Sequence, residues 1–183
     1  MDRRNLTSSK IRLSERISIW TEVEILSKLT PMGGVGPVFK WLFKIPILFY
    51  KLGLGWMIGN RTLLLTTTGR KTGKPRHTPL EYVYNPNEDW YRIAPGWGGN
   101  TDWYKNLLHD PHVTVRVGRR TFHAVAEPVP TAEAAEFMQA ISRRHPSMDK
   151  VWGRWCDRPI DGTFDGYVYA ARFFPSVRLR PIK

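Results

Sequence analysis

Residues 62–84 read TLLLTTTGRKTGKPRHTPLEYVY, a pattern typical of two β-strands joined by a tight turn. The run Thr62–Thr68 is β-branched and apolar and ends at a glycine, which predicts a buried strand. Alternate residues of Arg76–Tyr84 share one face of a second strand: Thr78, Leu80, Tyr82 and Tyr84. The sequence therefore predicts a hairpin whose turn is Gly69–Pro75.

The rest of the chain adds short strands and two helices. Further strands are predicted from β-branched and aromatic runs: Trp90–Ala94, Val113–Val117, Thr121–Ala126 and Ala170–Arg180. Helices are expected from Thr101 or Asp102 to His109 and from Thr131 to Arg144. The piece His145–Asp165 is aromatic and rich in loop formers. About six antiparallel strands, the first three of them in a meander, predict a mainly β fold with α additions (α+β), built as a small barrel.

The first 60 residues differ in composition from the rest. Apolar residues at spacings of three and four predict an amphipathic helix over Ser14–Leu29. Val38–Lys51 is the most apolar piece, but three lysines and Pro46 interrupt it, so it falls short of the roughly 20 apolar residues of a membrane crossing. Two interpretations stay open: a segment lying in an acidic membrane interface, or one packing against a partner subunit or the same chain. We expect residues 1–60 to be a docking segment and 61–183 the barrel domain.

Charge and cysteine content limit the classes of partner. The 28 Lys and Arg against 16 Asp and Glu give a net charge of +12, which implies an anionic partner such as nucleic acid, acidic lipid or a phosphorylated cofactor. Because no RNA-recognition signature occurs, we expect no nucleic acid partner. Cys156 is the single cysteine and fits a reducing, cytoplasmic location, and the N-terminus lacks the apolar run of a secretory signal. The histidine spacings predict no metal site.

The turn itself is a candidate anion site. Four cations fall within seven residues, and two glycines let backbone N–H groups point into one concavity: Arg70, Lys71, Lys74 and Arg76, with Gly69 and Gly73. The two arginines can hold phosphate through paired hydrogen bonds, and the Thr72 hydroxyl can donate. The turn lacks the Walker spacing and follows a strand without opening a helix, which disfavours a P-loop. An ordinary solvated hairpin tip stays the alternative.

A second candidate site is the glycine-rich loop Pro95–Asn100 with the helix that follows it. Glycines at 96, 98 and 99 permit a flat ring to approach the backbone. Three aromatic side chains offer stacking surfaces: Trp97, Trp103 and Tyr104. Asn106 lies one helical turn after Trp103. The alternative is that Trp103 belongs to the core side of the helix.

Together these motifs resemble the deazaflavin-dependent nitroreductase family. The resemblance rests on Thr66–Arg76, Thr78–Leu80, Trp103-Tyr104, Asn106-Leu107 and Asp110–Val115, and covers roughly Thr62 to Pro130. It implies a split β-barrel that binds coenzyme F420, a 5-deazaflavin. It also implies that the turn holds the phosphate and acidic tail of the coenzyme, through Arg70, Lys71, Thr72, Gly73, Lys74, Pro75 and Arg76. The ring linker would contact Thr78, Pro79 and Leu80, and the ring would contact Ala94, Gly98, Gly99, Trp103 and Asn106.

The resemblance implies an F420-dependent oxidoreductase that transfers hydride to a small acceptor such as a quinone or a nitro compound, with FMN as the alternative cofactor. Tyr104 and His145 are the candidate proton donors. Compared with the family pattern, Pro95–Asp102 lacks a ring-contacting serine, His145–Met148 replaces a tyrosine-bearing stretch, and Asp161–Tyr169 is inserted. The alternative function is therefore a membrane-associated accessory subunit or a cofactor-binding protein with little activity.

Overall fold

The computed structural model describes residues 45–52, 54–57, 62–95 and 99–182, and within them seven strands form one antiparallel sheet. The strand order is β2-β1-β5-β6-β7-β4-β3. The strands are β1 (Thr62–Thr68), β2 (Pro75–Glu81), β3 (Val83–Asn85), β4 (Trp90–Ile93), β5 (His112–Val117), β6 (Arg120–Pro128) and β7 (Val177–Pro181). The expected hairpin is confirmed, with Thr62 opposite Glu81 and Thr68 opposite Pro75.

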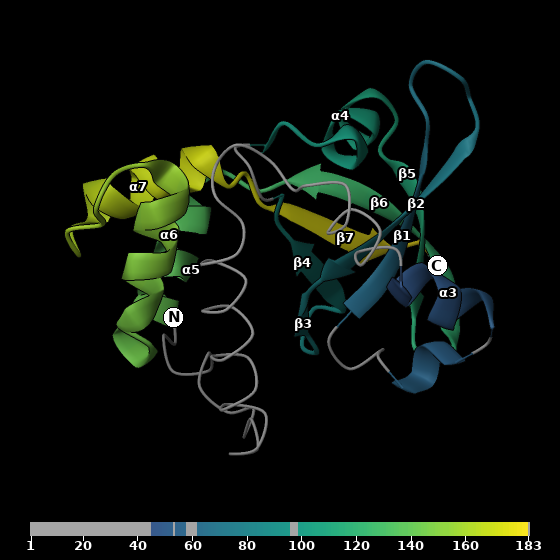
Figure 1. Cartoon of the computed structure of the whole chain (residues 1–183), viewed down its shortest axis with the longest axis horizontal. Coiled ribbons are helices and arrows are strands. Elements are labelled where there is room, and N and C mark those ends of the chain that lie inside the picture. The colour runs from purple at the N-terminus through teal and green to yellow at the C-terminus, as the bar shows by residue number, and fades with distance from the viewer. Residues whose placement is uncertain (1–44, 53, 58–61, 96–98, 183) are drawn as a thin grey trace.

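The sheet curls into a split-barrel-like fold (Figure 1). Its two edge strands, β2 and β3, are consecutive in the sequence and are separated by Tyr82 alone. Since a single residue spans only about 3.5 Å, the two edges of the sheet must approach each other there. The predicted fold class is confirmed. The single strand expected over Arg76–Tyr84 is instead two, because the chain leaves one edge of the sheet and joins the other at Tyr82.

The interior of the curled sheet is the main hydrophobic core. It is filled by inward-facing strand residues, and by Trp103 and Leu107 of helix α4 (Asp102–His109). The strand contributions are Leu63, Leu65, Tyr91, Ile93, Val113, Val115, Ala124, Ala126, Val177 and Leu179. Helix α4 is thus anchored on the core by one face and lies near the β1–β2 hairpin (Figure 1).

Three further helices pack together beside the sheet around a second core: α5 (Thr131–Arg144), α6 (Ser147–Cys156) and α7 (Phe164–Phe173). The expected helix Thr131–Arg144 is confirmed. The loop-rich interpretation of His145–Asp165 is wrong, and so is a strand beginning at Ala170. Tyr167, Ala170, Ala171 and Phe174 are buried at helical spacing. The Thr163 hydroxyl caps α7 by accepting the N–H of Gly166 at 3.1 Å.

An ion-pair triad joins α5 to the sheet. Arg92 of β4 and Arg178 of β7 lie opposite each other, and both donate to one oxygen of Glu133, at 2.6 and 2.5 Å. Arg92 is 6% exposed and its guanidinium lies 4.3 Å from the Phe137 ring centroid. Burial is the main cause that lowers the pKa of Arg92, and Glu133 opposes it. The triad therefore holds the helical unit against the outer face of β4 and β7.

Only part of the N-terminal docking segment is described. Helix α3 (Ile45–Lys51) packs near β1 and β2, and the 3-10 turn η1 (Leu54–Met57) packs against α3 and approaches Gly118 between β5 and β6 (Figure 1). Tyr50 is fully buried, and its hydroxyl donates to the carbonyl of Thr62 at 2.6 Å. The helix expected over Ser14–Leu29 lies outside the described residues, so the boundary near residue 60 stays a prediction. None of the helices in the described ranges is long and apolar enough to cross a bilayer.

Candidate functional site

The turn between β1 and β2 is closed by its own backbone. The N–H of Gly69 donates to the carbonyl of Lys74 at 2.9 Å, and the N–H of Gly73 to that of Gly69 at 2.8 Å. A Cβ at Gly69 would lie 3.0 Å from both the Lys74 carbonyl oxygen and the Thr72 hydroxyl, and Gly73 has φ +64°. Both positions therefore need glycine, and the turn is held tight enough to cluster its cations.

The predicted tail-binding residues are mostly exposed at this turn. Residues 71–76 are exposed, whereas Arg70 is half-buried with 27% of its side chain exposed. The structure thus brings the predicted residues together on one tip and leaves the ammonium groups of Lys71 and Lys74 and the guanidinium of Arg76 in reach of a ligand. Their roles toward the cofactor stay predictions.

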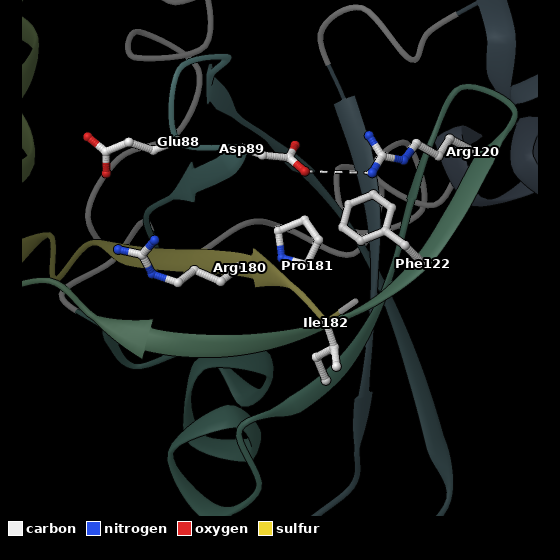
Figure 2. Close-up of a pocket in the computed structure, with 7 residues that line it drawn as sticks. All are labelled: Glu88, Asp89, Arg120, Phe122, Arg180, Pro181 and Ile182. Atoms are coloured by element: carbon white, nitrogen blue, oxygen red, sulfur yellow. Dashed lines mark ion pairs between the residues drawn. The ribbon is translucent and has the colours of Figure 1, made fainter.

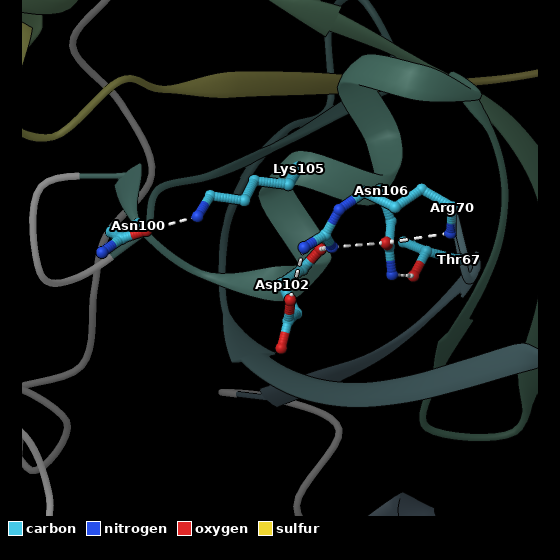
Figure 3. Close-up of polar contacts among 6 residues, drawn as sticks. All are labelled: Thr67, Arg70, Asn100, Asp102, Lys105 and Asn106. Atoms are coloured by element: carbon cyan, nitrogen blue, oxygen red, sulfur yellow. Dashed lines mark hydrogen bonds and ion pairs between the residues drawn. The ribbon is translucent and has the colours of Figure 1, made fainter. Parts of the chain in front are cut away.

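Asn106 of α4 fastens the turn to the helix (Figure 3). Its Oδ1 accepts from the backbone N–H of Arg70 at 3.2 Å and from Arg70 Nη1 at 2.9 Å. Its Nδ2 donates to Thr67 Oγ1 at 3.2 Å. Asn106 is 2% exposed and Thr67 is 1% exposed, so the bond between them is buried, while the two bonds to Arg70 are partly buried. Asn106 therefore positions the turn, and most of its hydrogen-bonding capacity is already used inside the protein.

Asp102, in the first turn of α4, forms a second link to Arg70. Its carboxylate accepts from Arg70 Nη2 at 2.9 Å, and its backbone carbonyl from Nη1 at 3.4 Å (Figure 3). The carboxylate is 87% exposed. At the other end of α4, hydrogen bonds from the N–H of His112 and from Thr68 lower the pKa of Asp110. Helix α4 is thus linked at its start to Arg70 of the β1–β2 turn and at its end to Thr68 of β1 and His112 of β5.

The predicted ring-side residues lie around α4 with different exposure. Trp103 is 5% exposed and belongs to the barrel core, as the alternative interpretation expected. Tyr104 is half-buried, and its ring lies edge-on to Trp103 with centroids 5.9 Å apart. A phenol is protonated at neutral pH and can donate, and burial raises the pKa of Tyr104 further.

The end of the glycine loop approaches Tyr104. A Cβ on Gly99, whose φ is +72°, would lie 3.5 Å from Tyr104 Cε1 and 3.1 Å from Pro175 Cγ. Ala94 is exposed just after β4. Trp97 and Gly98 lie outside the described residues. On β2, Thr78, Pro79 and Leu80 are half-buried, and Leu80 also packs on the barrel core.

His145 is placed elsewhere. It ends α5, where its backbone N–H donates to the carbonyls of Ile141 and Ser142 at 2.8 and 3.0 Å. Helix α5 belongs to the helical unit that Figure 1 shows at the left, beside the sheet and away from α4. Tyr104 and His145 therefore occupy different parts of the described fold, and Tyr104 is the one of the two beside the turn and the glycine loop.

Three residues of this region escaped the sequence analysis as site residues: Thr67, Thr101 and Asp102. Asp102 and Asn106 are four residues apart on a predicted helix, so a shared face was readable from their spacing. Thr67 shares the inward face of β1 with Leu63 and Leu65, so the alternation of a strand could have placed it there. Thr101 Oγ1 is buried and lacks a hydrogen-bond partner within the described part of the chain, although it precedes α4 where a capping bond is usual. A buried hydroxyl without a partner fits a polar ligand group beside it.

A pocket of about 290 Å³ lies at a separate place, where the β3–β4 turn meets β6 and the end of β7 (Figure 2). It is lined by Glu88, Asp89, Arg120, Phe122, Arg180, Pro181 and Ile182. Its charged groups are largely paired, with Arg120 3.8 Å from Asp89, and Arg180 2.9 Å from Glu127. It contains none of the predicted site residues.

Solved structures of similar shape include an F420-H2 dependent reductase (FDR-A). That structure aligns with 66% of this chain and 94% of its own, with 22% identity and a TM-score of 0.46. The heme storage protein HutZ from Vibrio cholerae aligns with 73% of this chain and 89% of its own, with 17% identity and a TM-score of 0.44.

Sequence comparisons identify the family. Residues 50–161 match the model of the family described as F420H(2)-dependent quinone reductase. F420H(2)-dependent quinone reductases of Mycobacterium tuberculosis strains H37Rv and CDC 1551 are each 40% identical over 119 residues, covering 59% of this chain and 78% of theirs. The matched range contains β1–β6 and α4–α6, and the match confirms the expected deazaflavin-dependent oxidoreductase and its cofactor. The chain belongs to the F420H(2)-dependent quinone reductase family.

Proposed function

We propose that this protein reduces a quinone with reduced coenzyme F420, whose acidic tail lies on the turn Gly69–Arg76. The observation that carries this proposal is the clamp between the turn and α4, in which buried Asn106 holds Arg70 at 2.9 Å. The clamp fixes a cluster of four cations against a helix that also carries Tyr104. The anionic tail of the cofactor would then bind to the turn, and its flat ring would lie beside Tyr104 on the adjoining helix.

The cofactor supplies the hydride when bound, and the protein supplies binding, orientation and protection from water. In our proposal Lys71, Lys74 and Arg76 attract the phosphate and carboxylates of the tail, because they are exposed and close in sequence. Thr78, Pro79 and Leu80 present a half-buried strip along β2 for the linker. These contributions are electrostatic and hydrophobic and need no residue to change its covalent state.

On the ring side, we propose that Gly99 leaves room for a flat group beside Tyr104. Thr101 Oγ1, which is buried and unpartnered within the described residues, supplies a polar contact that compensates for the missing serine. Asn106 and Trp103 support these residues from the interior without contacting the ring. Asn106 is buried and hydrogen-bonded within the protein, and Trp103 packs in the barrel core. Tyr104 remains the candidate proton donor, since its ring lies beside Gly99 and a phenol is protonated at neutral pH.

The test is reduction of a water-soluble benzoquinone under anaerobic conditions. Oxidation of F420H2 is followed through the absorbance difference between oxidised and reduced F420. We expect turnover with F420H2 and none with reduced FMN. Tyr104→Phe should lower kcat and change KM little, because the phenol would donate a proton to the acceptor. A nitro compound in place of the quinone defines how narrow the acceptor range is. Absence of F420 oxidation with either acceptor would contradict the proposal.

We also propose that the N-terminal segment places the enzyme on an acidic membrane surface, where quinones dissolve. Five large apolar side chains within ten residues are exposed on α3, on η1 and just after α3: Leu48, Leu52, Leu54, Trp56 and Met57, at 37% to 64% exposure. The Arg119 guanidinium lies 5.8 Å from the Trp56 ring centroid. Each basic residue near an acidic bilayer adds about 1 kcal/mol of attraction, and the buried apolar surface adds more.

Flotation with vesicles separates this proposal from docking on a partner subunit. We expect the full chain to float with vesicles containing phosphatidylglycerol and to stay behind with purely zwitterionic ones. Trp56→Ser with Leu52→Ser should reduce flotation, since both side chains are more than half exposed in the structure. If the chain ignores acidic vesicles and is dimeric by light scattering, the segment serves a subunit interface instead.

A further inference from the structure

Asp102 brings a negative charge to a strongly basic region. The sequence contains no Asp or Glu between Glu24 and Glu81, although nine Lys and Arg occur there, four of them on the turn. Asp102 reaches this turn from α4 and contacts Arg70 Nη2 at 2.9 Å. A carboxylate on that nitrogen has the same charge and the same acceptor chemistry as a phosphate oxygen.

The two holds on Arg70 differ in strength. Asn106 accepts Nη1 and the backbone N–H at a buried position, which fixes the arginine on α4. Asp102 accepts Nη2 with a side chain that is 87% exposed. Exposed ion pairs contribute little because water screens them and both side chains lose freedom. The Asp102 bond can therefore be exchanged while the Asn106 bonds remain.

We propose that Asp102 is a resident counter-anion: it occupies Arg70 in the free protein and gives way to the anionic tail of the cofactor. This inference rests on the proposed function, in which that tail lies on the turn. Asp102 then raises the charge that a ligand needs in order to bind. A ligand with several negative charges displaces it, one phosphate competes less well, and a ring without a tail does not compete at all.

The exchange predicts different effects on ligands that carry a phosphate and on ligands that do not. In Asp102→Asn the carboxylate charge is gone, so F420 should bind roughly two- to fivefold more tightly, the scale of an exposed ion pair. FMN should gain at least as much in proportion, and a deazariboflavin without phosphate should bind as it does to the wild type. Asp165→Asn is the control, because Asp165 is also an exposed aspartate in the first turn of a helix, α7.

A double-mutant cycle with Arg70→Gln distinguishes exchange on Arg70 from general repulsion. We expect Asp102→Asn to tighten F420 binding in the wild-type background and to change it by less than about 1.5-fold when Arg70 is already Gln, since the exchanged partner is gone. An equal gain in both backgrounds would overturn the inference, because the charge would then act through space. Weaker binding by Asp102→Asn would overturn it too, since Asp102 would then hold Arg70 ready for the ligand.

Lys74→Ala, measured by the same fluorescence titration, tells the failure of this inference from that of the proposed function. If Lys74→Ala weakens F420 binding while Asp102→Asn leaves it unchanged, the tail lies on the turn and only the exchange is wrong. If Lys74→Ala, Arg70→Gln and Asp102→Asn all leave the affinity unchanged, the tail lies elsewhere and both are wrong.

Discussion

Asn106 accepts two hydrogen bonds from Arg70, one from its backbone N–H at 3.2 Å and one from its guanidinium at 2.9 Å. A helix inside the barrel mouth thereby determines where a hairpin tip 36 residues away in sequence is held. The third bond of Asn106, to Thr67, continues this link into β1. The basic turn is thus rigidly connected to the helix that carries Tyr104.

Asn106→Ala should lower the free energy of unfolding by about 1–3 kcal/mol, the cost of leaving buried polar groups without partners. The groups left are the Thr67 hydroxyl and the Arg70 N–H. Urea denaturation followed by tryptophan fluorescence measures the change. Asn100→Ala is the matched control: Asn100 is exposed and its Oδ1 accepts from the exposed Lys105, so its loss should cost less than about 0.5 kcal/mol. Equal costs for the two variants would contradict a buried clamp.

The triad of Arg92, Glu133 and Arg178 predicts an asymmetry between its members. Glu133→Ala removes the shared acceptor from two guanidiniums, one of them 6% exposed, and should cost about 3 kcal/mol. Arg92→Met keeps an apolar stem against Phe137 and leaves Glu133 paired with Arg178, so its cost should be near zero. Thermal denaturation of both variants checks this. A larger loss for Arg92→Met than for Glu133→Ala would show that the arginine packing, and not the ion pair, joins the helical unit to the sheet.

Gly55→Ala tests whether η1 is seated on the barrel. A Cβ there would lie 2.4 Å from Tyr50 Cδ1 and 3.0 Å from the Gly118 carbonyl oxygen, so Tyr50 must move from its fully buried position. Such overpacking costs about 1–3 kcal/mol of unfolding free energy. Leu48→Ala, on the exposed face of α3, is the control and should change stability little. If both variants are as stable as the wild type, Tyr50 has room that the structure does not show.

Cys156 should be unreactive in the folded protein. Burial raises the pKa of its thiol to about 11, so at pH 8 roughly one thiol in a thousand is ionised, and the thiolate is the reactive form. Ellman's reagent at pH 8 should therefore modify the native protein very slowly and the urea-unfolded protein at once. Rapid modification of the native protein would mean that α6 opens readily around this residue.

Local sequence signals predicted the parts of the fold that depend on them. Thr62–Thr68 and Thr131–Arg144 have the strand and helix limits expected, since β-branched runs, a closing glycine and an acidic first turn act within a few residues. The division of Arg76–Tyr84 at Tyr82 was not predictable in this way. It depends on the curl of the whole sheet, which brings its two edge strands, β2 and β3, together.

The candidate site shows the same division. The cations of the turn and the face of α4 that carries Trp103 and Asn106 were readable from composition and spacing. The amide of Asn106 hydrogen-bonds to Arg70 and Thr67. These bonds depend on the contact between α4 and β1, which no local pattern encodes. Likewise α6 was interpreted as loop and the end of α7 as strand, since the shared core that α6 and α7 form with α5 is a tertiary contact that no local pattern encodes.

The most direct test of the central claim is the salt dependence of F420 binding to the wild type and to the Lys71→Ala, Lys74→Ala double variant. If the anionic tail lies on the turn, the wild-type Kd rises steeply between 50 mM and 500 mM salt, because ions screen the attraction. The double variant should bind more weakly at low salt, show a shallower dependence, and approach the wild type at high salt. If the two curves coincide over the whole salt range, the account is contradicted, since Lys71 and Lys74 would then have no part in holding the cofactor.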